Sequence, residues 1–314
     1  MIASWKSFLL QRSREWGLPG GEDWHYLLHN NYQPHYSNMN LIWFYGRERS
    51  PRLITKVFRE PRIVKREFEN LCYVHGKIPH LVPQPLYFGV TEQFWTLWMR
   101  GVPGSRFRAS DACSPAVLRS LSDTVTSMHL AMRKARSACS ADRYERVMAQ
   151  PLLGLASFGE AQAVRESCRS LLTQIPDRWI DGLPVIPQHG DLFLGNLLSD
   201  RGRWYVLDWE TYGITDLPIY DLVTLVISVL LTQGTAAEHW PVATTKQVRN
   251  LIDTYSRQFG LSRQDIGFLL PLSLANWFHL QWEDGRKEFT ERMYRVMDQY
   301  FSHKQAWEQA ILYV

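Results

Sequence analysis

Cysteine is scarce in this chain, with four residues in 314. They are far apart in the sequence, and no two of them form the Cys-x-x-Cys pair that is typical of a zinc site. Four dispersed thiols also do not make the dense disulfide framework of a small secreted domain. The cysteine pattern therefore indicates neither structural zinc nor a disulfide scaffold, and it favours a reducing compartment such as the cytoplasm.

Long hydrophobic runs are absent as well. The most apolar run, residues 222–231, is interrupted by Thr224 and Ser228 and is too short to cross a bilayer. Residues 1–16 lack the continuous apolar segment of a signal peptide. We therefore expect a cytoplasmic protein with no membrane partner.

A strong excess of one charge is also missing, since 35 Lys and Arg oppose 31 Asp and Glu, for a net charge of +4. The two signs alternate through most segments, whereas nucleic-acid-binding domains gather basic residues on one face. This argues against a nucleic-acid partner. The hydrophobic fraction of 45% is ordinary for a globular protein, and the length suffices for two lobes.

The first hundred residues have the pattern of an antiparallel sheet with one helix. The predicted strands cover residues 40–45, 53–58, 86–90 and 94–99. A helix is predicted after Pro61, with Ile63, Phe68, Leu71 and Cys72 near its apolar face. The segment 1–100 is therefore expected to form a small lobe.

The remainder, 101–314, is predicted to be mostly helical. A Gly- and Pro-rich connector, 100–107, opens it. Two strand-like segments, 183–200 and 203–210, interrupt the helical pattern. The predicted helices cover residues 116–138, 161–175, 219–231, 246–259 and 264–282.

These two strand-like segments carry the chemistry. Asp191 follows a strand, Asn196 comes five residues later, and Asp208 and Glu210 end the next strand. A carboxylate and an amide at this spacing can serve a substrate hydroxyl and a metal ion, and Mg²⁺ prefers such oxygen ligands. Two carboxylates about 4 Å apart repel by roughly 4 kcal/mol at an intermediate dielectric, so the cluster calls for a cation.

The run HGDLFLGN followed by VLDWE resembles the catalytic loop and metal motif of the aminoglycoside phosphotransferase and choline kinase superfamily, whose fold is related to protein kinases. The resemblance implies that Asp191 is the catalytic base. It implies Mg²⁺ ligands at Asn196 and Asp208, a possible second acidic contact at Glu210, and a scaffold role for His189.

The resemblance also requires a phosphate-binding lysine with a glutamate partner in the first lobe. Lys56 lies in the apolar strand LITKVF, and Glu67 follows on the next helix, where the resemblance favours it over Glu69. By the same resemblance, the segment LWMRGVPG falls where the hinge of the family holds adenine through backbone groups, so Met99, Arg100 and Gly101 are hinge candidates.

Two features depart from the usual kinase pattern. The expected phosphate loop, residues 37–46, is not glycine-rich, and Ser37 to Asn40 are its only candidate contacts. The metal motif is Asp-Trp-Glu where protein kinases carry Asp-Phe-Gly. This difference points toward the choline kinase and thiamine kinase branches.

Related enzymes present substrate-binding aromatics on the helix LSLANWFHLQWEDGR, and Trp277 and Trp282 are candidates to hold a cationic acceptor. Five residues separate them by about 140° on a helix, so they need not share one wall. Leu274, Phe278 and Trp282 form an equally reasonable core stripe. Glu283 and Asp284 could meet an amine.

The sequence therefore predicts an α+β, two-lobed, protein-kinase-like fold, with a nucleotide lobe at 1–100 and a helical acceptor lobe at 101–314. The predicted activity is ATP- and Mg²⁺-dependent phosphoryl transfer to a hydroxyl of a small polar metabolite, which could resemble choline, ethanolamine, an aminoglycoside, thiamine or a sugar.

Two alternatives to the kinase stay open at this point. They are a nucleotide-binding pseudokinase and a metal-dependent hydrolase built on His189, Asp191 and Asp208. Asp221, which opens the helix at 219–231, is expected to cap that helix or to brace the catalytic loop.

Overall fold

A computed structural model gives the structure of the protein. It describes residues 2–32, 37–58, 60–107, 114–134, 142–158, 161–176, 178–231, 242–283 and 287–311. The chain forms two compact units. Unit 1 comprises residues 1–106 and 196–211, and unit 2 comprises 107–195 and 212–314. Whether the functional lobes follow the predicted division at residue 100 stays a prediction.

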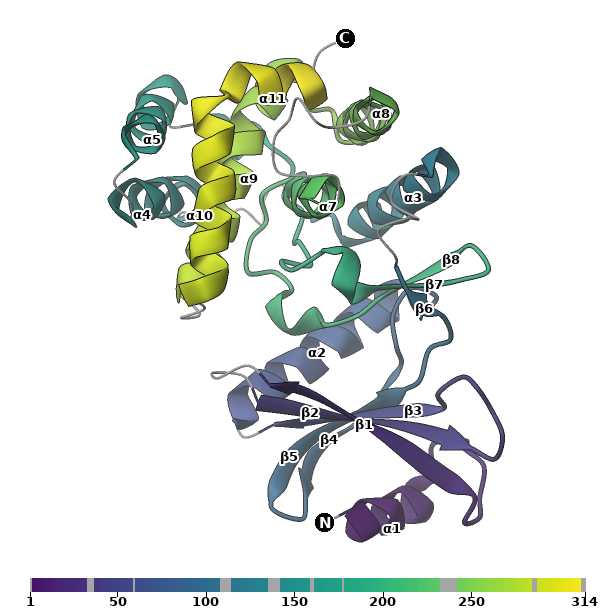
Figure 1. Ribbon diagram of the computed structural model, residues 1–314. Coiled ribbons are helices and arrows are strands. Elements are labelled where there is room, and N and C mark those ends of the chain that lie inside the picture. Colours follow the sequence, from purple (N-terminus) through teal and green to yellow (C-terminus); the bar gives the residue numbers. More distant parts are fainter. Residues whose placement is uncertain are drawn as a thin grey trace. The chain divides into compact units, whose positions relative to one another are not determined.

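Unit 1 is built on an antiparallel sheet of five strands in the order β1-β2-β3-β5-β4 (Figure 1). The β2–β3 hairpin and the strands β4 and β5 were predicted from β-rich runs and turn signals, whereas β1 was missed. The strands are β1 (Trp24–Tyr32), β2 (Ser37–Tyr45), β3 (Leu53–Phe58), β4 (Pro85–Thr91) and β5 (Phe94–Arg100).

Helix α1 (Ile2–Arg12) covers one face of this sheet (Figure 1). Tryptophans dominate the contact, because Trp5 and Trp16 pack with Trp43 and Trp98, which the strands present on that face. The indole N–H of Trp43 donates to Thr55 Oγ1 at 2.9 Å, so this burial leaves its polar group satisfied. This core anchors the back of the sheet.

Helix α2 (Pro61–Lys77) lies on the other face (Figure 1). Its buried stripe consists of Val64, Glu67, Leu71 and Val74. The prediction that Cys72 shares the apolar face was wrong, since Cys72 is exposed. The observed stripe keeps the i, i+3, i+7, i+10 spacing of one helical face, and it includes a glutamate.

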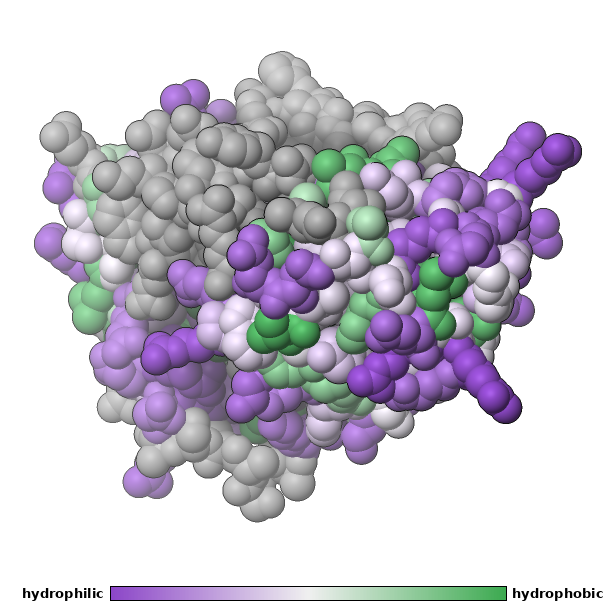
Figure 2. Space-filling model, turned by 90° about the horizontal axis from the view of Figure 1, so that it is seen from below, coloured by the Kyte–Doolittle hydropathy of each residue, from purple (hydrophilic) through white to green (hydrophobic). Residues whose placement is uncertain are grey.

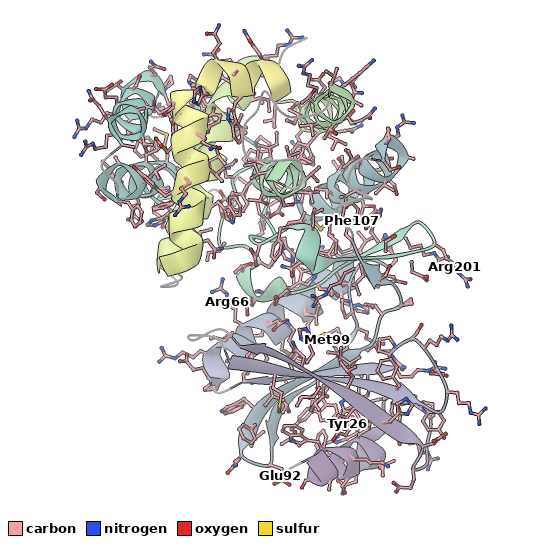
Figure 3. The ribbon with its side chains drawn as sticks, viewed as in Figure 1. Tyr26, Arg66, Glu92, Met99, Phe107 and Arg201 are labelled. Carbon is pink, nitrogen blue, oxygen red and sulfur yellow. The ribbon has the colours of Figure 1, made fainter. Side chains whose placement is uncertain are left out.

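The later part of unit 1 is a second, small sheet of order β6-β7-β8. Its strands are β6 (Ser105–Arg106), β7 (Leu197–Asp200) and β8 (Arg203–Val206). Arg201 and Gly202 make the hairpin turn with positive φ, and Figure 3 shows Arg201 at its tip. Val206 N–H donates to Leu81 O at 2.8 Å, which ties the hairpin to the first part of unit 1.

Unit 2 is mostly helical, as predicted. One apolar core joins α4, α5, α7, α8, α9 and α10. Its helices are α3 (Pro115–Met132), α4 (Gln150–Phe158), α5 (Gln162–Gln174), α6 (Trp179–Gly182), α7 (Tyr220–Leu231), α8 (Val242–Phe259), α9 (Arg263–Glu283), α10 (Lys287–Ser302) and α11 (Lys304–Ile311). Short helical turns are η3 (Glu145–Ala149), η4 (Leu194–Asn196) and, in unit 1, η5 (Trp209–Thr211).

Helix α3 ends earlier than the predicted residue 138. Arg133 leaves the helical conformation with ψ of 130°, and Lys134 N–H then donates to Val185 O at 3.0 Å. Lys134 therefore forms an isolated β-bridge with Val185, and residues 135–138 of the predicted helix lie outside the described residues. Such a long-range bond cannot be read from helical periodicity.

Among the described helices, none combines the length and hydropathy needed to span a membrane. Figure 2 shows one face of the molecule, on which hydrophobic residues form small, separated patches among hydrophilic ones.

We predict that Gly101→Ala lowers the free energy of unfolding by about 1–3 kcal/mol, because the new Cβ would overlap the backbone carbonyl of Pro51. Urea denaturation measures the effect. Gly76→Ala is the control, since a Cβ there meets nothing within 4 Å inside helix α2, and it should stabilise by roughly 0.5–1 kcal/mol. Equal effects of the two substitutions would contradict the steric argument.

Candidate active site

Lys56 is the centre of a charged cluster in unit 1. It lies on β3, and its side chain points to the α2 face of the sheet, where its ammonium contacts Glu67 Oε1. The same Nζ lies 2.9 Å from Asp208 Oδ1. Glu69, the other glutamate considered, is exposed and lies 3.7 Å from Lys65. The structure therefore brings together Lys56, Glu67 and Asp208, which are far apart in the sequence.

The electrostatics of this cluster follow from burial and close opposite charge. Burial by itself would lower the pKa of Lys56, but the carboxylates of Asp208, Glu67 and Glu210 together raise it above the ordinary value. Burial raises the pKa of Glu67, and the ammonium of Lys56 opposes that change. Lys56 is thus firmly cationic, and it compensates one of three nearby carboxylates.

The β7–β8 hairpin places Asn196 and Asp208 at the same end. Leu197 pairs with Val206, and Leu207 N–H donates to Asn196 O at 2.9 Å just beyond that pair. Asp208 then adopts φ of +68°, a region that few residues other than glycine enter. This turn of the backbone directly follows β8, and the pairing of β7 with β8 ends before Asp208.

The donor set at this end fits a divalent cation. A carboxylate oxygen of Glu67, one of Asp208 and one of Glu210 all lie within 4.8 Å of one another. Glu67 Oε2 is buried and has no hydrogen-bond partner. Carboxylates supply the hard oxygen donors that Mg²⁺ prefers. Glu67 was not among the predicted metal ligands.

Asn70 is a residue of the site that sequence reasoning missed. Its side-chain Nδ2 donates to Trp209 O at 2.9 Å, which fastens η5 to α2. Asn70 follows Glu67 by three residues, so one face of the helix holds both the lysine partner and the metal motif. In the sequence, an asparagine at that spacing looks like any solvent-exposed helix residue, so no signal distinguishes Asn70 as part of the site.

An apolar row crosses the sheet on the same face as Lys56. The strand register aligns Leu27, Ile42, Ile54 and Met99 side by side on β1, β2, β3 and β5. Leu27 is 53% exposed, whereas Met99 at the far end is 4% exposed. Figure 3 shows Met99 on the α2 side of the sheet. The row lies two residues along β3 from Lys56, and it is most exposed at its β1 end.

Gly101 follows β5, and its backbone is already engaged within unit 1. Its N–H donates to Arg52 O at 3.0 Å, and the preceding amide of Arg100 donates to Gln84 O at 2.8 Å. The close passage of Pro51 explains why glycine stands at this position. Among the hinge candidates, the amides of Arg100 and Gly101 are thus already engaged, and the role of Met99 stays a prediction.

The loop with Asp191 belongs to unit 2. Gly190 has φ of +89°, and Asp191 N–H donates to the ring Nδ1 of His189 at 3.2 Å. His189 is buried, whereas Asp191 is half-buried. The histidine thus supports the backbone of the loop, as a scaffold residue would, and the aspartate is the accessible acid.

Asp221 at the start of α7 braces this loop. Its carboxylate accepts the backbone N–H of His189 at 2.6 Å and that of Gly190 at 3.0 Å. It also lies 3.0 Å from His129 Nε2. Burial would raise the pKa of Asp221, but the hydrogen bond from His129 and the interactions with His189 hold it below the ordinary value of 3.8. Asp221 was expected either to cap α7 or to brace the catalytic loop, and these contacts support the second role.

The predicted acceptor residues have mixed outcomes. Trp277 is 5% exposed and packs in the core of unit 2, which favours the core alternative. The side chains of Trp282 and Glu283 lie outside the described part of the structure, as does Asp284. In the expected phosphate loop, the backbone of Ser37 belongs to β2, and only from Met39 onward are side chains described.

The family model described as Phosphotransferase enzyme family matches residues 39–266, well over half of the chain. The chain belongs to the phosphotransferase enzyme family. The matched segment contains every candidate site residue from Lys56 to Asp221. None of the curated proteins matches the sequence.

Solved structures share the fold at low sequence identity. Choline kinase from Cryptosporidium parvum superposes with a TM-score of 0.67 at 12% identity, covering 99% of this chain and 98% of that chain. A putative aminoglycoside phosphotransferase from Ralstonia eutropha gives 0.63 at 16% identity, with 99% and 98% covered. Plasmodium vivax ethanolamine kinase gives 0.60 at 11% identity, with 91% and 83% covered. The predicted protein-kinase-like fold is confirmed.

We predict that Asp221→Asn lowers the free energy of unfolding at pH 7 by about 3–5 kcal/mol. The substitution removes a buried carboxylate, and the NH₂ group of the new amide would face backbone N–H groups, which are also donors. The folded pKa lies below the ordinary one, so the carboxylate stabilises the fold above about pH 4. This stabilisation is lost as the pH falls through the folded pKa. The difference from wild type should therefore shrink below about pH 4.

Urea denaturation from pH 7 to pH 3.5 would measure this difference. Asp181→Asn is the control, because Asp181 is an exposed aspartate of unit 2 and should change the free energy by less than about 0.5 kcal/mol. A difference between wild type and Asp221→Asn that stays constant with pH would disprove the stabilising role of the ionised carboxylate.

Proposed function

We propose that this phosphotransferase uses ATP and Mg²⁺ to phosphorylate a hydroxyl group of a small polar metabolite. The ion-pair cluster of Lys56 with Glu67 and Asp208 carries the proposal. A lysine that is largely buried in an apolar strand is costly, and here it is held beside a carboxylate that could bind a metal ion. Phosphoryl transfer needs this combination of a fixed cation and a metal ligand.

The nucleotide would lie on the α2 face of the sheet in unit 1. The apolar row from Leu27 to Met99 suits a purine ring, which needs a flat hydrophobic contact. Lys56, two residues along β3, would contact the α- and β-phosphates. Bound Mg²⁺ would neutralise phosphate charge, held by Asp208 with Asn196 and Glu210, and Glu67 would keep the lysine in place.

In the transfer step, the acceptor oxygen forms a bond to the γ-phosphorus while the bond between that phosphorus and the bridging oxygen of ADP breaks. The proton of the acceptor hydroxyl goes to the carboxylate of Asp191, which we assign as the base. His189 and Asp221 would keep the Asp191 loop in one conformation through the bonds to its backbone. Most of the rate enhancement would come from positioning and fixed charge.

The metal-dependent hydrolase alternative leaves the lysine cluster without a use. A hydrolase built on His189, Asp191 and Asp208 has no need of a cation paired with Glu67. His189 is also buried, and its ring Nδ1 accepts the Asp191 amide. The lysine cluster therefore favours the kinase.

We predict that Asp191→Asn reduces turnover by about 10²–10⁴-fold, because general base catalysis contributes that much. ATP affinity should stay within about twofold, since Asp191 is not assigned to the nucleotide. Mg²⁺-dependent ADP release with a panel of amino alcohols, sugars, aminoglycosides and thiamine would first identify an acceptor. Calorimetry with a non-hydrolysable ATP analogue then measures binding.

Asp200→Asn in the β7–β8 turn serves as the control for Asp191→Asn and should retain full turnover. Unchanged turnover in Asp191→Asn would refute its role as base. ADP release with none of these acceptors, together with tight ATP binding, would support the pseudokinase alternative.

We predict that Lys56→Met lowers kcat/KM for ATP by at least about 10²-fold, because it removes a fixed charge aimed at the phosphates. Steady-state kinetics at varied ATP would show the loss. Lys65→Met removes a lysine from the exposed side of α2 and should leave kcat/KM unchanged. Activity that survives Lys56→Met would favour the hydrolase.

A further inference from the structure

A chain of buried polar groups runs through three helices of unit 2 and ends at the Asp191 loop. Tyr255 on α8, His129 on α3 and Asp221 on α7 are each at most 1% exposed. The Tyr255 hydroxyl lies 2.7 Å from His129 Nδ1, and His129 Nε2 lies 3.0 Å from Asp221 Oδ2. Burying polar groups costs free energy unless their hydrogen bonds are satisfied, so such a chain of groups calls for a structural or functional explanation.

Counting protons fixes the direction of this chain. Asp221 is ionised and can only accept, so His129 Nε2 must carry a hydrogen. Burial raises the pKa of Tyr255, so its hydroxyl keeps its proton and can donate to His129 Nδ1. The other acceptor positions of Asp221 receive the amides of His189 and Gly190.

Tyr255 also holds a strained residue. Ile219 has φ of +71°, which is a genuine outlier for a β-branched side chain and costs on the order of 1–3 kcal/mol. The N–H of Ile219 donates to the Tyr255 hydroxyl at 3.3 Å. One hydroxyl therefore secures both the backbone just before α7 and the histidine that contacts Asp221. Neighbouring Tyr220 adds a bond from its hydroxyl to Gly190 O at 3.2 Å.

We infer that Tyr255 and His129 are positioning residues for phosphoryl transfer, which act through Asp221 to hold the backbone of residues 189–190 and thereby the carboxylate of Asp191. The inference rests on the proposed function for its catalytic consequence. Its structural part, the control of the loop amides, stands on the hydrogen bonds alone.

The arrangement is more specific than a network that only stabilises the core. Tyr255 and His129 are both far from Asp191 in the sequence. His129 nevertheless contacts the carboxylate of Asp221, which accepts the amides of the two residues directly before Asp191. The Tyr255 ring packs against Phe259 with centroids 4.4 Å apart. Removing only the hydroxyl therefore keeps the packing and tests the polar chain alone.

Amide hydrogen exchange of Tyr255→Phe tests the structural part. Exchange at His189 and Gly190 should speed up by about tenfold, because His129 loses the hydroxyl that orients it toward Asp221. Tyr300→Phe is the control, since Tyr300 is another buried tyrosine of unit 2, with its ring against Trp307. Unchanged exchange at the two amides, or equal acceleration in Tyr300→Phe, would overturn the inference.

Kinetics test the catalytic part. Tyr255→Phe should lower kcat by about tenfold and leave KM for ATP within about twofold, whereas general destabilisation would lower the active fraction without this pattern. In the Asp191→Asn background, Tyr255→Phe should cause no further loss, because the group being positioned is gone. An equal loss in both backgrounds would refute the positioning role.

Variants at His129 keep the inference testable if Tyr255→Phe does not fold. His129→Gln can still donate to Asp221 from its amide nitrogen, whereas His129→Ala cannot. We expect Gln to recover most of the kcat that Ala loses, and equal kcat values for the two would contradict the inference. If exchange changes as expected but Asp191→Asn retains full turnover, the proposed function fails and the structural part stands.

Discussion

The candidate site depends on one electrostatic requirement, that a lysine ammonium inside an apolar strand be paired with carboxylates. Removing such a charge from water costs several kcal/mol unless opposite charge and hydrogen bonds replace the water. Lys56 finds its partners on α2 and on the segment after β8. The sheet, the helix and the hairpin of unit 1 are thus joined at the point where their charges meet.

Local backbone conformation adds a second constraint. Among the described residues, four non-glycine positions have positive φ, and two of them, Glu92 and Arg201, lie in hairpin turns. The other two are Asp208, at the metal motif, and Ile219, directly before α7. Strain of this kind persists only where surrounding contacts overdetermine it. Both positions are held in this way, by Lys56 at Asp208 and by the Tyr255 hydroxyl at Ile219.

The two units divide the chemistry between charge and backbone. In unit 1, the sites that we propose for phosphates and a cation are formed by charged side chains, and the site proposed for a base is an apolar row. In unit 2, Asp221 orders the loop that carries Asp191 through hydrogen bonds to main-chain amides. Relatives with 11–16% identity keep the same fold, since alternation and burial rather than particular side chains determine it.

The sequence alone determined the fold class, the β2–β3 hairpin, the strands β4 and β5 and helix α2, and it gave Lys56, Glu67, Asp191 and Asp208 as candidates for the chemistry. Periodicity and short motifs are local, so they can be read along the chain. Strand β1 was missed because its apolar and polar residues do not alternate clearly. Only the tertiary structure decided that Glu67 carries a buried, unpartnered oxygen, that Asn70 fastens η5, that the Gly101 amide is occupied, and that His129 lies within hydrogen-bonding distance of both Tyr255 and Asp221. Each of these depends on contacts between distant segments, and a single sequence holds no record of which polar residue will face which partner.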